Sequence, residues 1–136
     1  MKKLFVALMA VLVMASCGGG SDKKADPGQF LDEIISVTET VLEKGEQAIR
    51  ADDAEILVVA FEKFADQAVD IYNRYGDAFD GLSPEEQNKY QGKAMRLMSL
   101  LQEVQGLEYE LKQLDASPSQ QQRVLKAYAK IENANK

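Results

Sequence analysis

The sequence predicts an all-α fold, an antiparallel bundle of three long helices plus a short C-terminal helix. From position 30 onward, apolar residues recur at steps of three and four, the spacing that places them on one face of a helix. No segment shows the strict alternation of apolar and polar residues that is typical of a half-buried strand. Two Ser-Pro pairs, Ser83-Pro84 and Ser117-Pro118, are typical helix starts, because serine caps a helix and proline fits its first turn.

The first two helices should each contain roughly 22 residues and extend about 33 Å. The second follows Asp52 and Asp53, which are both suited to capping, and it should end at Tyr75 because Gly76 stops it. The apolar face of the first helix contains Phe30, Ile34, Val37, Val41, Gly45, Ala48 and Ile49, and that of the second contains Leu57, Phe61, Phe64, Ala68, Tyr72 and Tyr75.

The third and fourth helices have the clearest starts. Ser83 is followed three residues later by Glu86, which completes a capping box, and Ser117 with Gln120 repeats this pattern. The apolar face of the third helix contains Tyr90, Ala94, Leu97, Leu101, Val104, Leu107, Leu111 and Leu114, and that of the fourth contains Val124, Leu125, Tyr128 and Ile131.

The predicted third helix is longer than the first two helices. If it is continuous from Pro84 to Leu114, it extends about 46 Å and overhangs them. Either Gly106 breaks the helix, or the short fourth helix folds back over the overhanging leucines. We expect the second arrangement.

The N-terminal segment has the character of a signal peptide. Lys2 and Lys3 precede an apolar run over residues 4–15, too short for the roughly 20 residues that a membrane-spanning helix needs. Met14 is too large for ordinary secretory cleavage, which favours small residues at the third position before the cut. The residues MASC, ending at Cys17, resemble instead the lipobox of bacterial lipoproteins, which signal peptidase II cleaves.

This resemblance implies cleavage before Cys17, a diacylglyceryl thioether on its sulfur and a third acyl chain on the new N-terminus. At about 0.8 kcal/mol per buried CH₂, three chains make membrane attachment effectively permanent. Plain secretion and an uncleaved anchor are the alternatives, and the lone thiol could instead be buried or form an intermolecular disulfide. Gly18, in place of aspartate, implies sorting to the outer membrane of a Gram-negative cell, with periplasmic or surface orientation open.

The predicted organisation is therefore a lipoprotein signal peptide over residues 1–16, a lipid-anchored flexible tether over 17–29 and a helical bundle domain over 30–136. The tether is expected to be flexible because its residues are small, polar and rich in glycine. About 107 residues remain for the bundle, enough for one domain with a modest core.

The charge pattern argues against nucleic acid as a partner. Without residues 1–16, the chain keeps 14 basic and 22 acidic residues, whereas nucleic-acid binding favours clustered lysine and arginine. The charge is also uneven, −11 over residues 30–87 and +3 over residues 88–136. This asymmetry could steer a partner, but we favour two solvated faces that balance each other.

No catalytic, cofactor or metal site is predicted. The chain has no histidine, and its one cysteine is assigned to the anchor, which excludes Ser-His-Asp, Cys-His and nitrogen–sulfur zinc sites. Ser21 and Lys24 fit a serine–lysine spacing but lie in the tether, and Glu85-Glu86 is explained by helix capping. The loop over residues 76–81 offers only Asp80 as a side-chain ligand in calcium-loop register.

Two stretches, residues 56–61 and 94–101, are apolar around more than one helix face and should form the centre of the bundle. The alternative is that Met95, Met98 and Leu100 remain exposed as an interaction surface, either an adaptable groove or a dimer seam, because methionine suits surfaces that repack.

Two further resemblances bear on function. MASCGGG and residues 75–92 (YGDAFDGLSPEEQNKYQG) resemble small helical lipoproteins of Bacteroidota, which implies an envelope location and no particular activity. Periplasmic chaperones of the Spy and CpxP type carry Leu-Thr-x-x-Gln near a helix start, and here Leu82-Ser83 is followed by Gln87 one residue too late.

We therefore expect a lipid-anchored, non-enzymatic binding or structural module with an envelope protein partner. The alternatives are a chaperone-like holdase and an enzyme that uses carboxylates alone. Exposure of Met95, Met98 and Leu100 would favour the holdase, and a deep pocket lined by two carboxylates would favour the enzyme. The oligomeric state is left open.

Overall fold

The computed structural model describes residues 26–75 and 83–134, and within these ranges the chain forms four helices and no strand. The helices are α2 (Pro27–Ala51), α3 (Ala54–Tyr75), α4 (Pro84–Gln113) and α5 (Pro118–Ala134). Their lengths are 25, 22, 30 and 17 residues. The predicted all-α class is confirmed. None of these helices combines the length and the apolar character needed to span a bilayer.

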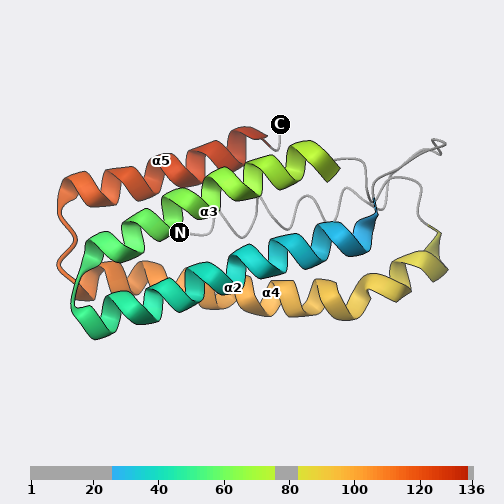
Figure 1. Ribbon diagram of the computed structural model, residues 1–136, viewed down its shortest axis with the longest axis horizontal. Coiled ribbons are helices and arrows are strands. Elements are labelled where there is room, and N and C mark those ends of the chain that lie inside the picture. Colours follow the sequence, from blue (N-terminus) through green and yellow to red (C-terminus); the bar gives the residue numbers. More distant parts are fainter. Residues whose placement is uncertain (1–25, 76–82, 135–136) are drawn as a thin grey trace.

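Helices α2 and α3 form a central hairpin, and each of them has one outer helix packed beside it in parallel orientation (Figure 1). The α2–α3 hairpin is antiparallel, α4 packs on α2, and α5 packs on α3. In Figure 1, α4 runs in the same direction as α2, and α5 in the same direction as α3. Each of the two central helices therefore has two main packing partners, whereas each outer helix has one.

The first helix begins three residues earlier than its apolar spacing predicts. Asp26 caps α2 with its side chain, which accepts a hydrogen bond from the Gly28 amide at 2.8 Å, and Pro27 occupies the first turn. Residues 27–29, which the sequence assigned to the tether, therefore belong to the helix. The physical reason is the cap, because aspartate followed by proline starts a helix before its first large apolar residue.

Both tight turns end a helix in the same way. Asp52 after α2 and Asp115 after α4 adopt the left-handed conformation, with φ of 53° and 56°. The amides of Asp53 and Ala116 donate to carbonyl oxygens five residues back, at 3.0 Å in each case. This is the Schellman arrangement, which satisfies carbonyl groups that a helix end leaves free. Asp52 therefore ends α2, and Asp53 caps α3 by accepting from the Glu55 amide at 3.0 Å.

The two predicted capping boxes are confirmed. The Glu86 amide donates to the Ser83 hydroxyl at 3.2 Å, while the Glu86 carboxylate accepts from the Ser83 amide at 3.4 Å. The Gln120 amide donates to the Ser117 hydroxyl at 3.1 Å, and the Gln120 side chain accepts from the Ser117 amide at 2.9 Å. These bonds satisfy amides that the first turns of α4 and α5 would otherwise leave unpaired.

Helix α4 is continuous through Gly106, and its overhang lies at the end opposite to the expected one. A Cβ atom on Gly45 would contact Leu107, and one on Gly28 would contact Tyr90, so both contacts join residues 62 positions apart. This parallel register places the end of α4 level with the end of α2. Leu107 is thus covered by α2, while the first turns of α4, residues 84–89, extend beyond the start of α2 and are mostly exposed.

The core takes side chains from all four helices, as the apolar spacing predicts. Two expected core positions are exposed instead, Ile49 and Leu125. Each lies one residue after a buried neighbour, Ala48 or Val124, and a step of one residue turns about 100° around a helix, away from the core. The largest fully buried side chains are Phe30, Phe61, Phe64, Leu31, Ile34, Leu57, Leu97, Leu101, Ile131 and Val41.

Ion pairs join each outer helix to its central partner. From α4, Lys93 contacts Asp32 and Arg96 contacts Glu39 of α2, at 2.8 and 2.9 Å. From α5, Arg123 and Lys130 contact carboxylates of α3. The acidic first half of the sequence and its more basic second half therefore meet across helix interfaces. This agrees with the expectation that the uneven charge is balanced within the molecule.

Two glycine substitutions should separate close packing from helix propensity. In Gly45→Ala, the new Cβ would lie 2.5 Å from Leu107 Cδ2 and 3.3 Å from its Cγ, so the whole side chain must move. Overpacking costs about 1–3 kcal/mol, and we expect a net loss of stability despite the better helix former. In Gly106→Ala, no described atom lies within 4 Å of the new Cβ. Because alanine is the better helix former, we expect the free energy of unfolding to rise by about 1 kcal/mol.

Urea unfolding followed by circular dichroism measures both free energies. Stabilisation by both substitutions to the same extent would show that α4 does not approach α2 closely at Gly45.

Candidate functional site

A long groove runs along the outer side of the α2–α3 hairpin, and we call it the α2–α3 groove. It consists of two hollows of about 480 and 430 Å³ that share Val37 and Gln67 as lining residues. The size of the larger hollow falls within the roughly 300–1,000 Å³ that is usual for ligand sites. Its apolar lining is made of Val37, Val41, Ile56, Val59, Ala60 and Phe64.

The groove exists because two faces of the hairpin remain uncovered. Phe64, Val41 and Ala60 are buried and form its floor, whereas Val37, Ile56 and Val59 are half-buried along its walls. Since α4 and α5 pack on other faces of α2 and α3, no described helix lies over these walls. The groove is therefore a partly solvated apolar surface of the bundle.

Charged side chains are ordered along the groove. Lys44 of α2 and Lys63 of α3 line the larger hollow from opposite walls. Within the described ranges, neither lysine forms an ion pair, and Lys44 contacts only the amide oxygen of Gln47, at 3.4 Å. Carboxylates lie toward both ends, Asp53 and Glu55 near the turn, and Glu33, Asp66 and Asp70 in the second hollow. The middle of the groove is cationic. Its ends keep a net negative charge, because the carboxylates there outnumber their paired cations: Asp53 and Glu55 against Arg123, and Glu33, Asp66 and Asp70 against Arg74, which also lines the second hollow, and Lys130.

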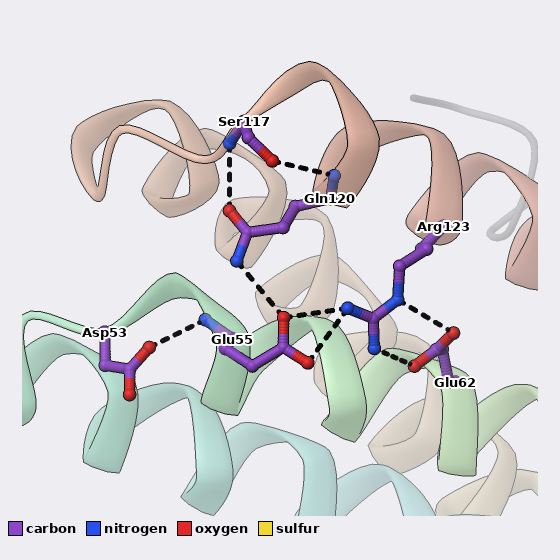
Figure 2. A network of polar contacts seen from close by, with 6 residues as sticks. All are labelled: Asp53, Glu55, Glu62, Ser117, Gln120 and Arg123. Carbon is purple, nitrogen blue, oxygen red and sulfur yellow. Dashed lines mark hydrogen bonds and ion pairs between the residues drawn. The ribbon is translucent and has the colours of Figure 1, made fainter.

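A network of polar contacts joins α3 to α5 beside this groove (Figure 2). Arg123 lies between Glu55 and Glu62, with Nη1 2.8 and 2.9 Å from the two Glu55 oxygens and Nη2 2.6 Å from Glu62 Oε1. The Gln120 side chain donates to Glu55 at 3.2 Å while it also caps α5. The two glutamates are seven residues apart, which places both on the α5 side of α3.

These contacts shift the pKa values of the carboxyl groups that they hold. Hydrogen bonds from Arg123 and then Gln120 lower the pKa of Glu55 below its ordinary 4.5. Hydrogen bonds from Arg74 and then Tyr75 lower the pKa of Glu33 in the same direction. A general acid that works near neutral pH needs a raised carboxyl pKa. The pKa values of Glu33 and Glu55 are lowered instead, so neither carboxyl group is suited to act as such an acid.

The groove also differs from the deep pocket lined by two carboxylates that would favour an enzyme. Both hollows are open, and the acids along them are engaged: Asp70 with Arg74 at 2.9 Å, Asp66 with Lys130 at 3.0 Å, and Asp53 with a backbone amide. Across residues 26–75 and 83–134, no three carboxylates or other metal-ligating side chains gather into a possible metal site.

Two buried tyrosines form a separate polar feature of the core. Burial raises the pKa of Tyr72, whose hydroxyl has no hydrogen-bond partner among residues 26–75 and 83–134. Burial, followed by the Glu108 carboxylate beside it, raises the pKa of Tyr128. Both hydroxyls therefore stay protonated at neutral pH. Tyr128 also packs edge-on against Phe61, with ring centroids 5.7 Å apart, so it links α5 to α3.

The structure separates the three residues of the predicted interaction surface. Met95 is 62% exposed, Met98 is half-buried and Leu100 is only 7% exposed. Leu100 therefore belongs to the core, as expected for the centre of the bundle, and is not available as surface, so the alternative that all three form one exposed groove is wrong for Leu100. The reason is angular, because positions 95 and 100 lie about 140° apart around α4, and only the second faces α2.

Other predicted features lie outside the described residues. These are Cys17 with its lipobox, the tether before Asp26, and the loop over residues 76–81, in which only Asp80 fits the register of a calcium loop. The groove itself was not predicted. The sequence gives little indication of the groove. Val37 and Ile56 have the spacing of core residues, and the residues around them do not show which helix faces stay uncovered.

Comparisons of the chain with protein families, with curated proteins and with solved structures found no match.

Loss of the central arginine of the α3–α5 network should change stability in a pH-dependent way. Arg123 lowers the pKa of Glu55, so its contribution is present above the unfolded pKa of that carboxyl and is lost as pH falls through the folded value. We therefore expect Arg123→Gln to lower the Tm at pH 7 and the difference to shrink below pH 4.5. Scanning calorimetry across this range measures it.

Arg50→Gln is the matched control. Arg50 contacts Glu46 at 3.6 Å, and both side chains are at least 70% exposed, so little change in Tm is expected at any pH. A Tm difference for Arg123→Gln that stays constant down to pH 2 would show that packing of the side chain, and not the carboxylate contacts, stabilises the bundle.

Proposed function

We propose that this chain is a lipid-anchored protein of the bacterial cell envelope, with a helical module that binds a ligand or protein partner without catalysis. In this proposal residues 1–16 are a signal peptide, Cys17 carries the acyl chains, and the module is located at the outer membrane. The lipobox-like MASC sequence and the glycine-rich residues that follow it support the anchor.

The single observation that supports a binding module is the α2–α3 groove. Its apolar walls stay half-exposed at Val37, Ile56 and Val59, on a bundle whose other large apolar side chains are mostly buried. Partly exposed apolar grooves with a few placed polar groups are the usual form of binding sites. The ion-paired carboxylates along it favour binding over acid–base chemistry. The holdase loses support, since only Met95 of its three residues is exposed.

Substitution of the proposed acylation site tests the anchor. Cys17→Ser should abolish incorporation of radiolabelled palmitate and remove the protein from the outer-membrane fraction, because no other thiol exists in the chain. Ser21→Ala, four residues later, is the control and should leave both measurements unchanged. Palmitate incorporation into Cys17→Ser equal to that of the wild type would contradict the proposal.

A second substitution tests the groove as the binding site. Val59→Glu places a carboxylate on a groove wall at a half-buried helix position, where the fold should tolerate it. Native mass spectrometry of protein released from membranes in mild detergent should show a bound species in the wild type that Val59→Glu loses. Gln122→Glu, at an exposed position of α5, is the control and should keep it. If Val59→Glu keeps the bound species, the partner binds elsewhere.

A further inference from the structure

The larger hollow of the α2–α3 groove combines an apolar floor with two lysines that lack ion-pair partners within the described ranges. Most other cations of α2–α5 that lie between helices are paired, including Lys93, Arg96, Arg123 and Lys130. Lys44 and Lys63 are therefore positive charges left available at an apolar site. A ligand that matches this surface needs an apolar body and an anionic group.

The two lysines lie near the same level of the hairpin. Lys44 is eight residues before Asp52 and Lys63 is ten residues after Asp53, on antiparallel helices that meet at this turn. At 1.5 Å per residue, these positions differ by about 3 Å along the bundle. One anionic group placed over the middle of the groove is thus within reach of both long, mobile amines.

The apolar floor continues from the lysines toward the turn. Val59 and Ile56 precede Lys63 by four and seven residues in α3 and therefore lie nearer the turn, whereas Val41 and Phe64 form the floor at the level of the lysines. This run extends roughly 10 Å from the lysine level. Its length suits an alkyl chain of medium length lying along the groove with its head at the lysines.

The charge order disfavours larger occupants. An acidic helix lying along the groove would pass a net negative charge at each end, from Asp53 and Glu55 against the single Arg123 and from Glu33 and Asp70 against the single Arg74, and like charges repel there. A second copy of the chain, docked groove to groove about a two-fold axis at the middle, would bring Lys44 and Lys63 against the same lysines of its partner. A compact ligand with a single negative charge avoids both the repulsion at the ends of the groove and the repulsion between lysines of two copies.

We propose that the α2–α3 groove binds a free fatty acid of medium chain length. Its carboxylate lies between the amines of Lys44 and Lys63, and its chain lies on Val41, Ile56, Val59 and Phe64. This inference names the ligand of the site in the proposed function and rests on it. The binding is non-covalent, with exchange of water for the alkyl chain as its apolar driving force.

Photolabelling tests this inference on the full chain, held in phosphatidylcholine nanodiscs without detergent. The probe is dodecanoate that carries a diazirine on its chain, with the diazirine analogue of dodecanol as its uncharged counterpart. After irradiation, mass spectrometry maps the labelled peptides. Label from the acid is expected on the groove peptides of α2 and α3, and excess unlabelled dodecanoate should remove it.

Charge reversal identifies the role of the lysines. Lys44→Glu/Lys63→Glu should lower labelling of the groove by the acid at least about fivefold, because two attractive contacts become repulsive. Lys112→Glu/Lys126→Glu makes the same charge change at exposed positions of α4 and α5, and should leave labelling unchanged. Labelling by the alcohol should be weak and the same in all three proteins. Far-UV circular dichroism checks that each variant stays helical.

Four results would overturn the inference: equal labelling of the groove in Lys44→Glu/Lys63→Glu, label mainly on α4 or α5, equal labelling by the alcohol, or covalent dimers joined through groove residues. The last result would identify a second copy as the occupant. A bound species that Val59→Glu loses and that is not a fatty acid would overturn this inference alone and leave the proposed function standing. If Cys17→Ser incorporates palmitate like the wild type, the anchor is contradicted alone, and the same labelling is then measured on the full chain in solution.

Discussion

Burial of the apolar seam between α2 and α3 is the interaction on which the other parts of this structure depend. Ile34 of α2 and Leu57, Phe61 and Phe64 of α3 are almost fully buried, and each such side chain contributes on the order of 1.5–3 kcal/mol. Helix α4 packs on α2 and α5 packs on α3, so each outer helix is positioned by one half of this hairpin. The groove lies on the outer side of the same seam and exists only while the hairpin is intact.

Charge then specifies which outer helix lies where. The pairs that Lys93, Arg96 and Lys130 form with the central helices are largely exposed, so each contributes little to stability, whereas the Arg123 pairs are less exposed. Their effect is on arrangement, because Lys93 and Arg96 match acids of α2 whereas Arg123 matches the paired glutamates Glu55 and Glu62 of α3. Close approach at Gly45 brings α4 near enough for these contacts. Packing thus supplies the energy and sets the register at Gly45, and charge favours α4 on α2 and α5 on α3.

The sequence predicts what is local and misses what depends on neighbours. The four helices and the capping boxes of Ser83 and Ser117 follow from spacing and from contacts within one turn. The overhang of α4 was placed at the wrong end because its register depends on Gly45 and Leu107, which are 62 residues apart in sequence. Leu100 and Met95 belong to one apolar stretch, and only the position of α2 decides that the first is buried. The groove is a consequence of the same kind, since it is the face that no described helix covers.

The position of the groove in the chain relates the proposed anchor to the proposed ligand, because both involve the membrane. Helix α2 begins at Pro27, so fewer residues separate Cys17 from the first helix than the sequence suggested, the eight from 18 to 25 before the Asp26 cap. Eight glycine-rich residues have an r.m.s. span of about 15 Å. A lipid on Cys17 would therefore hold the start of α2, and with it the second hollow that begins at Glu33, close to a bilayer, with the lysine level about 25 Å further along the helix. Fatty acids partition into bilayers, so the anchor would raise the local concentration of the ligand that Lys44 and Lys63 are placed to bind.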